Sequence, residues 1–221
     1  RSVVPMPEQL TPRESMIYGT AGFTAALSVY QLAEHGVTPE KGEILVSGAT
    51  GGVGGIAISI LSKIGYSVVA VTGKKDETEY LKEIGAASVI DTGQAVDDSS
   101  RLLFKAKWAG SVDTVGGDLL ATTLKSMKPA GVVTCCGNAA SGDLPVNVYP
   151  FILRGITLVG IDSQNCPMPL RRKTWEKLAR EWRIKAFEQK ASEVSLEQVD
   201  REIDKMLQRR HKGRTIVNLD K

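Results

Sequence analysis

The sequence predicts an α/β fold in which a doubly wound, six-stranded parallel sheet is covered by helices on both faces. Short apolar runs alternate with segments of helical periodicity along most of the 221 residues. The runs are almost continuously apolar, which is typical of strands buried on both faces of a parallel sheet. A glycine-rich turn joins the first of these runs to the segment that follows it. The hydrophobic content of 42% is ample for a large packed core.

The first strand and helix flank the glycine turn. Residues 44–47 are apolar or small, and residues 56–64 have the spacing of a helix. The same pattern then recurs along the chain, and the strand order 3-2-1-4-5-6 is expected for such a sheet. Further strands are expected at 67–71, 87–90, 111–115, 131–136 and 155–160, with helices at 76–84, 99–107 and 119–127.

The two ends of the chain differ from this repeating pattern. Residues 14–35 form a long, mostly apolar helical stretch that Gly19 and Gly22 interrupt. After residue 170 the sequence predicts charged helices at 171–185 and 196–209. Strands are expected at 191–194 and 215–219, and the partner of the last one need not lie in the six-stranded sheet.

The glycine turn has the spacing of a phosphate-binding loop. Ala49, Gly51 and Gly54 match the dinucleotide fingerprint G-x-G-x-x-G, with alanine in the first glycine position. A pyrophosphate would lie there, because a helix N-terminus offers unpaired N–H groups and a positive dipole end. Glycine-rich turns also occur for steric reasons alone. The strand before this turn, the helix after it and the second strand behind favour a Rossmann-type nucleotide site.

The end of the second strand favours NADP(H) over NAD(H). In NAD-binding domains an Asp or Glu about 20 residues beyond the glycines holds the ribose diol. The corresponding stretch here, Thr72-Gly73-Lys74-Lys75, carries no acid. Two lysines at the start of a helix oppose its dipole, which is unfavourable unless an anion lies nearby. The alternative interpretation is that Asp76 and Glu77 neutralise these lysines in solvent.

Charge and cysteine content exclude several classes of function. A net charge of +3 is too small to indicate nucleic-acid binding, and the basic runs at 171–173 and 209–212 have the simpler interpretation of solvated helix faces. Three cysteines fit neither a disulfide framework nor a zinc site, which predicts a reducing, cytoplasmic compartment. No run approaches the ~20 apolar residues of a membrane span, and no signal-peptide pattern is present. A first residue other than Met suggests a piece of a longer chain.

Several reactive side chains have a structural interpretation beside a functional one. Cys135 and Cys136 end a strand at the ligand-binding edge of the sheet, but free cysteines are most often small buried hydrophobic residues. Asp113 could act as a general base or cap the turn that follows its strand. His35 suits a helix C-terminus, and neither it nor His211 has neighbours at metal-ligand spacing.

Several motifs, in the same order along the chain, resemble the medium-chain dehydrogenase/reductase superfamily. They are Met16–Ala25, Ala49–Gly54, Thr72–Lys74 and Asp113–Gly117. A narrower resemblance, to the acrylyl-CoA reductase branch of the zinc-independent quinone oxidoreductases, is carried by Tyr149–Ile156, Gly160–Ser163 and Lys212–Val217. Together these motifs extend over nearly the whole chain.

The resemblance implies a two-domain, NADPH-dependent enzyme whose N-terminal lobe is a partly open β-barrel that carries much of the substrate site. Residues 1–13 would be the remnant of that lobe, 14–165 the NADP-binding Rossmann domain, and 166–221 the helices and strand that return toward the lobe. The tyrosine that positions nicotinamide and substrate in this branch would lie upstream of Arg1, so the catalytic residues stay unassigned. The zinc ligands of alcohol dehydrogenases have no counterpart in the sequence, and no metal is expected.

The resemblance also implies the cofactor contacts. Thr50, Gly51, Gly52 and Val53 would face the pyrophosphate. Thr72, Gly73 and Lys74 would bind the 2′-phosphoadenosine end, with Thr92 near the adenine. On the nicotinamide side the implied contacts are Asn138, Ile152 and Ser163, with a late contact from Arg209. Thr92 and Arg209 stand where other members can have arginine and asparagine, and Asn138 stands where a small or apolar residue is usual. Thr24 and Arg214 are further candidates without an assigned role.

These observations predict hydride transfer from NADPH to the β-carbon of an activated alkene, while the protein fixes the nicotinamide face and stabilises the developing enolate. The resemblance implies an acryloyl-CoA-like thioester as substrate, with a quinone or another enone as the alternative. Arg154, Arg171 and Arg172 could contact the phosphates of a CoA substrate.

Two other classes of protein remain as alternatives. One is a non-catalytic NADP-binding protein, and the other is a different Rossmann enzyme such as a methyltransferase, which the acid-free second strand disfavours. The apolar edge strand at 155–160 predicts a homodimer. The chain alone is expected to bind NADPH weakly and to be inactive, because half of the cleft would be absent.

Overall fold

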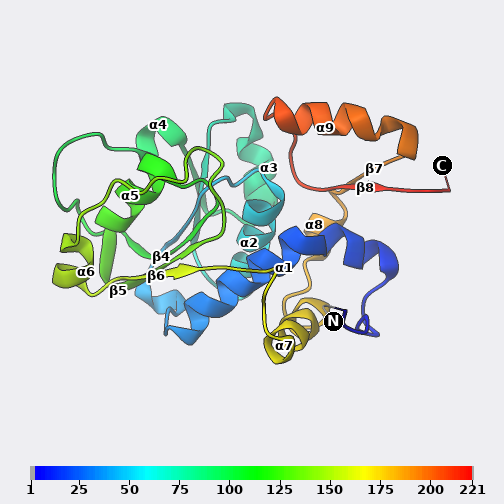
Figure 1. The fold of residues 1–221 in the computed structure, drawn as a ribbon, viewed down its shortest axis with the longest axis horizontal. Coiled ribbons are helices and arrows are strands. Elements are labelled where there is room, and N and C mark those ends of the chain that lie inside the picture. The colour runs from blue at the N-terminus through cyan, green and yellow to red at the C-terminus, as the bar shows by residue number, and fades with distance from the viewer. Residues whose placement is uncertain (1–2, 221) are drawn as a thin grey trace.

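The computed structural model describes residues 3–220 and contains the predicted doubly wound sheet (Figure 1). All six strands are parallel and lie in the order β3-β2-β1-β4-β5-β6, which confirms the predicted order. The strands are β1 (Ile44–Val46), β2 (Val68–Thr72), β3 (Ser88–Asp91), β4 (Trp108–Asp113), β5 (Met127–Cys135) and β6 (Thr157–Gly160).

Helices cover both faces of the sheet. Alternate residues of β1 point to opposite sides: Ile44 and Val46 join the apolar cluster formed with α1, α2 and α3, whereas Leu45 packs in a separate cluster with Leu119 of α5. The helices that flank the sheet are α1 (Pro12–Glu34), α2 (Gly52–Lys63), α3 (Thr78–Glu83), α4 (Thr92–Ala95), α5 (Gly117–Lys125) and α6 (Tyr149–Arg154), with short 3₁₀ turns η1 (Pro39–Lys41) and η2 (Lys75–Glu77).

The long first helix has a defined start and a kink. Thr11 forms a capping box with Glu14, in which each side chain accepts from the other residue's N–H at 3.2 and 2.7 Å. Pro12 occupies the first turn, where its missing N–H costs nothing. Gly19 interrupts the helix with a φ of 47°, a conformation that glycine adopts without strain. This kink lies at the nucleotide site described below.

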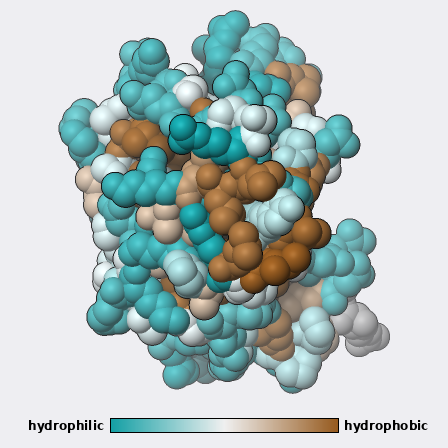
Figure 2. All heavy atoms as spheres, turned by 90° about the vertical axis from the view of Figure 1, so that its left-hand side faces the viewer, coloured by the Kyte–Doolittle hydropathy of each residue, from teal (hydrophilic) through white to brown (hydrophobic). Residues whose placement is uncertain are grey.

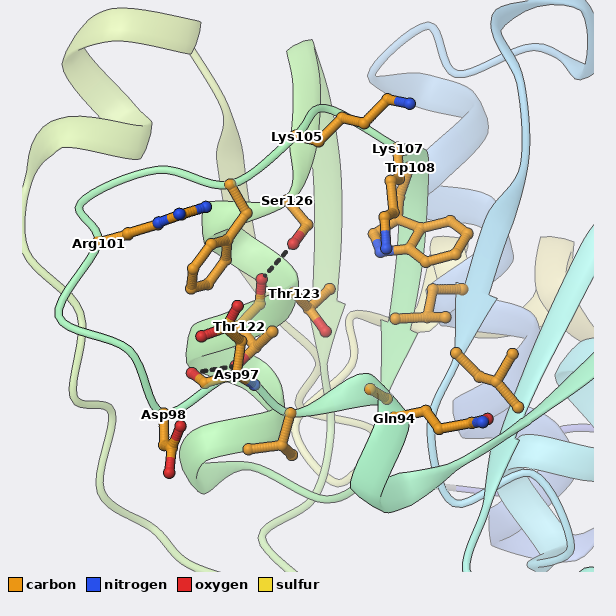
Figure 3. Close-up of a pocket in the computed structure, with 15 residues that line it drawn as sticks. Gln94, Asp97, Asp98, Arg101, Lys105, Lys107, Trp108, Thr122, Thr123 and Ser126 are labelled. Atoms are coloured by element: carbon orange, nitrogen blue, oxygen red, sulfur yellow. Dashed lines mark hydrogen bonds between the residues drawn. The ribbon is translucent and has the colours of Figure 1, made fainter.

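The connection from β3 to β4 corrects the prediction of a helix at 99–107. Asp91 and Gln94 cap the single turn of α4, and residues 96–107 then cross to β4 without a helix (Figure 3). The main-chain N–H groups of Phe104 and Lys107 donate instead to Lys125 O and Ser126 O, at 2.9 and 2.8 Å. Because the end of α5 satisfies these donors, a local helix is not needed there. A cavity of about 410 Å³ remains between this segment, α4 and α5.

The C-terminal part, residues 168–220, lies beside the six-stranded sheet and contains a second, two-stranded sheet (Figure 1). Strand β7 (Ser192–Val194) pairs in parallel with β8 (Thr215–Val217), so the last strand does have its partner outside the six-stranded sheet. The helix predicted at 171–185 ends earlier, because the backbone of Arg180 leaves the helical region. The remaining elements are α7 (Met168–Ala179), α8 (Lys185–Glu188), the 3₁₀ turn η3 (Leu196–Gln198) and α9 (Val199–Leu207). No helix within residues 3–220 combines the length and apolarity needed to cross a bilayer.

Candidate nucleotide-binding site

The glycine turn opens the N-terminus of α2 at the carboxyl edge of the sheet. The helix begins at Gly52, four residues earlier than the sequence spacing indicates, and Gly51 is its N-cap. Among residues 3–220 no side chain caps this end, so the first N–H groups of α2 are available to bind an anion. An ideal Cβ on Gly54 would collide with Gly48 O and lie 2.9 Å from its carbonyl carbon. Glycine at 54 therefore allows α2 to approach the turn closely.

Asp113 shapes the neighbouring strand end rather than serving as a free base. Its buried carboxylate accepts from Ser47 Oγ at 2.7 Å and from the N–H groups of Gly116 and Val115 at 2.8 and 3.3 Å. Burial raises the pKa of Asp113, and these hydrogen bonds offset part of that rise. The interpretation of Asp113 as a turn cap is thus confirmed.

The end of β2 gathers the residues expected near a 2′-phosphate. Thr72 Oγ1 accepts from Lys74 N at 3.0 Å, and a Cβ on Gly73 would lie 3.7 Å from Thr92 Oγ1. The Lys74 ammonium is half-buried and donates to His211 O. Burial lowers the pKa of Lys74, and Glu77 partly opposes that effect. Because an ammonium has three donors, two stay available for a ligand.

Glu77 does not neutralise Lys74 by a direct ion pair. Its Oε2 atom pairs with Lys212 Nζ at 2.9 Å instead. Within residues 3–220, neither Asp76 nor Glu77 forms a salt bridge with Lys74 or Lys75. These acids and lysines are therefore not joined by direct ion pairs among the described residues, whereas the charge of Glu77 does raise the pKa of Lys74. Neutralisation through solvent stays an alternative interpretation.

Residues 209–214 form a strap across the carboxyl edge of the sheet. At one end Arg209 Nη2 donates to Ala139 O at 3.3 Å, beside the predicted contact Asn138. Further along, Gly213 N donates to Thr50 O at 2.9 Å in the glycine turn. Arg209, Arg210 and Lys212 are exposed, as the interpretation of this basic run as a solvated face predicts, but the run follows α9 instead of lying on it. Arg209, His211 and Gly213 tie the C-terminal part to the ends of β5, β2 and β1.

Arg214 places a half-buried guanidinium at the start of α2. Its Nε donates to Ile17 O at 2.8 Å. An ideal Cβ on Gly52 would lie 3.3 Å from Arg214 Nη1, and one on Gly19 would lie 3.0 Å from Nη2. Burial lowers the pKa of Arg214, although arginine remains charged at neutral pH. A cation and free helix N–H groups thus face the same position, which suits a pyrophosphate.

The predicted nicotinamide-side residues are only partly brought together. Asn138 and Ser163 follow the carboxyl ends of β5 and β6. Ile152 is 70% exposed on α6, whose Arg154 bonds to Lys125 O and Met127 O at the opposite end of β5, both at 2.8 Å. The structure does not place Ile152 beside the other candidates. The Thr24 hydroxyl donates to Thr20 O at 2.8 Å and is committed to α1.

The three arginines expected to contact a CoA phosphate differ in their surroundings. Arg154 is wrong as an anion contact, because its guanidinium is occupied by Lys125 O, Met127 O and Phe104 O. Arg171 donates to main-chain carbonyls after β6. Arg172 is exposed, and its side chain forms no hydrogen bond or ion pair within residues 3–220.

The cysteines at the end of β5 do not form a metal site. Cys136 Sγ donates to Asp113 O at 3.3 Å, and burial raises the pKa of its thiol to about 12. Burial also raises the pKa of Cys135, so both thiols stay protonated at neutral pH. Among residues 3–220 no three His, Cys, Asp or Glu side chains are grouped so that they could hold a metal ion. The donor set of the described chain does not fit a zinc site.

Fold and site together define a dinucleotide-binding domain of the doubly wound class. The chain belongs to the zinc-binding dehydrogenase family, whose domain model matches residues 52–182. This membership confirms the resemblance to the medium-chain dehydrogenase/reductase superfamily.

Three relatives show how far the similarity extends. The acrylyl-CoA reductase AcuI of Ruegeria pomeroyi is 40% identical over 99% of the chain. The structure of Escherichia coli YhdH with bound NADPH is 43% identical over 97% of the chain, with a TM-score of 0.93. That of Bacillus subtilis YhfP with NAD bound is 47% identical over 98% of the chain, also with a TM-score of 0.93. The chain spans 66% of the length of each of these three proteins.

Proposed function

We propose that this chain is the NADP-binding part of an oxidoreductase that reduces an activated C=C bond. The observation that carries the proposal is the pairing of an open α2 N-terminus beside Arg214 with an acid-free β2 end that holds Lys74. An enoyl thioester such as acryloyl-CoA is the favoured substrate class, in keeping with the name of the Ruegeria relative. A quinone or another enone is the alternative acceptor.

The described residues would bind and orient the cofactor. Gly52, Val53 and Arg214 would bind the pyrophosphate, with Thr50 and Gly51 shaping the turn. Thr72, Gly73 and Lys74 would bind the 2′-phosphate, and Thr92 would lie near the adenine. Asn138, Ser163 and Arg209 would lie toward the nicotinamide side. When bound, NADPH would supply the hydride.

We further propose the domain boundaries 1–13, 14–165 and 166–221, with the first and last segments packing on an N-terminal lobe. The C-terminal elements support this division. Helix α9 leaves Ile203, Met206 and Leu207 exposed by 47%, 51% and 77%. Such a row of apolar side chains on one helix is typical of a surface that another part of a protein covers. A cytoplasmic location belongs to the same proposal and is supported by three free cysteines.

The test of the proposed function measures binding first and turnover second. The chain should be retained on immobilised 2′,5′-ADP and released by NADP but not by the same concentration of NAD. A form that includes the N-terminal lobe should oxidise NADPH with an enone or enoyl-CoA, whereas the chain alone should not. Equal affinity for NAD and NADP would overturn the 2′-phosphate assignment. Binding without turnover by the longer form with any enone, quinone or enoyl-CoA would favour a non-catalytic NADP-binding protein.

We also propose that two copies of the protein associate at the β6 edge. Strand β6 pairs with β5 and lies at the end of the sheet order, so its outer edge is open. The adjoining α6 region exposes Val148, Tyr149, Ile152 and Leu153, by 61%, 41%, 70% and 62%. Figure 2 shows an apolar patch on the side of the molecule where α6 lies. Pairing of two such edges would bury both the patch and the open strand.

A single substitution tests the proposed dimer. Leu153→Asp should convert a dimer into a monomer, because it places a charge in the apolar surface that the partner would cover. Leu102→Asp is the control, since Leu102 is also exposed, by 48%, but lies in the crossover rather than on α6. Light scattering after size exclusion measures the mass of each form. A wild-type mass of one subunit, or a dimer that survives Leu153→Asp, would rule out this interface.

A further inference from the structure

We propose that Arg171 is a positioning residue that holds the turn carrying Ser163 at the nicotinamide side of the site. The contact of this turn with nicotinamide rests on the proposed function. The hydrogen bonds by which Arg171 holds the turn do not depend on it. Arg171 lies in the first turn of α7, eight residues after Ser163 along the chain. Its side chain reaches back to the residues that follow the carboxyl end of β6.

The guanidinium bonds directly to the main chain of this turn. Arg171 Nη2 donates to Ser163 O at 2.9 Å and to Gln164 O at 3.0 Å. Within the turn, Asp162 Oδ1 accepts from Gln164 N and Asn165 N at 3.0 and 3.1 Å. The Asp162 carboxylate therefore shapes the turn locally, and Arg171 fixes it to α7. Two hydrogen bonds from one planar cation orient the carbonyls more strictly than a lysine would.

The guanidinium of Arg171 itself packs on an aromatic pair, Phe23 and Trp175. Its Cζ lies 4.8 Å from the centroid of the Phe23 ring, within the range of a cation–π interaction. Phe23 is buried in α1 and stacks on Trp175 at 6.0 Å with an interplanar angle of 6°. Trp175 follows Arg171 by one helical turn on α7. Arg171 thus joins α1, α7 and the turn after β6.

The same residues border a cavity beside the kink of α1 at Gly19. Its volume is about 500 Å³, and its lining includes Gly19, Thr20, Ser163 and Arg171. Gly19 also faces Arg214, so the cavity adjoins the start of α2. A movement of the Ser163 turn would therefore change the wall of the site.

The hydrogen-bond inventory of Arg171 argues against a role in stability alone. Its Nε is buried and has no hydrogen-bond partner among the described residues. A buried donor without a partner is destabilising. This cost offsets part of the stability that the two Nη2 bonds contribute, whereas it leaves the orientation that they impose on the turn unchanged.

The test compares Arg171→Met with Arg172→Met, a matched control on the neighbouring exposed residue. Dissociation constants are measured for NADPH and for 2′,5′-ADP, which lacks the nicotinamide half. Arg171→Met should weaken NADPH binding about tenfold, because the Ser163 turn would no longer be held in place for the nicotinamide half and would have to be ordered on binding. It should leave 2′,5′-ADP binding unchanged, because the Lys74 end is intact. Arg172→Met should change neither dissociation constant. The NADPH affinity of Arg171→Lys should lie between that of wild type and that of Arg171→Met.

A second measurement needs no ligand. Amide hydrogen exchange at residues 161–166 should be faster in Arg171→Met than in wild type, with exchange in β1 and β2 unchanged. If wild type binds neither NADPH nor 2′,5′-ADP, the proposed function fails, and the exchange result alone decides the role of Arg171. Wild-type NADPH affinity in Arg171→Met would overturn the inference. So would an equal loss of both ligands, or unchanged exchange in the turn.

Discussion

Replacing Gly54 by alanine is expected to lower the free energy of unfolding by about 3 kcal/mol, the upper range for overpacking a tight contact. The new Cβ would collide with Gly48 O and would lie 2.9 Å from the Gly48 carbonyl carbon and 3.0 Å from Ala49 Cα. These are main-chain atoms of the glycine turn, so no side-chain rotation can relieve the clash. The start of α2 must then move away from β1, and nucleotide affinity should fall with stability.

The sign of the change in the free energy of unfolding distinguishes close packing at Gly54 from helix propensity. Gly54 lies within α2, where alanine is about 1 kcal/mol more favourable than glycine by helix propensity alone. Propensity therefore predicts stabilisation, and close packing predicts the reverse. Gly160→Ala is the matched control, because no described residue lies within 4 Å of its ideal Cβ, and it should change stability by no more than about 0.5 kcal/mol. Urea unfolding of the three proteins measures the difference. A Gly54→Ala protein as stable as Gly160→Ala would contradict the close approach of α2 to the turn.

The strand order could be predicted because it depends on short-range patterns and general rules of topology. Each strand contains a short apolar run that the sequence shows, and parallel strands joined by right-handed crossovers permit few arrangements. The boundaries were less accurate. The first helix after the turn starts at Gly52 because glycine residues enter the helix for reasons of packing, which helical periodicity does not register.

The helix predicted at 99–107 failed for a different reason. The hydrogen-bond partners of Phe104 and Lys107 lie more than fifteen residues away, at Lys125 and Ser126. Local periodicity contains no information about such partners. Where tertiary contacts satisfy the backbone, they override a weak local preference.

The residues of the candidate site fall into the same two groups, those that local sequence motifs locate and those that tertiary contacts bring to the site. Thr50–Val53 lie in the turn after β1, and Thr72–Lys74 include the last residue of β2 and the two that follow it, so sequence motifs locate both groups. Arg214 and Arg171 reach the site from distant segments through contacts with Ile17 and Ser163. For the strap and α7 the sequence signal was a basic run, which is more often a solvated face. The expectation for Ile152 rested on resemblance, and the structure places that residue on a helix away from the other candidates.

Replacing Lys74 by methionine is expected to lower the affinity for NADPH by about 10- to 100-fold while leaving that for NADH within about twofold. The estimate follows from the ~1.5–3 kcal/mol of a hydrogen bond to a charged group. Only NADPH carries the 2′-phosphate, so the ammonium contributes to one cofactor and not to the other. Isothermal titration calorimetry of wild type and Lys74→Met with each cofactor measures the change in the dissociation constant for NADPH and for NADH. Lys75→Met is the matched control, because Lys75 is exposed and its side chain forms no salt bridge within residues 3–220.

The contact between Lys74 and His211 O supplies a competing explanation that the same titrations separate. Loss of this bond frees the strap, which also touches Thr50 in the glycine turn through Gly213 N. A loosened strap would disturb the pyrophosphate region that NADH and NADPH share, so both affinities would fall by the same factor. Lys74→Arg keeps the positive charge and should retain most of the preference for NADPH. An equal loss for both cofactors in Lys74→Met would assign Lys74 to the strap and remove the 2′-phosphate contact from the site.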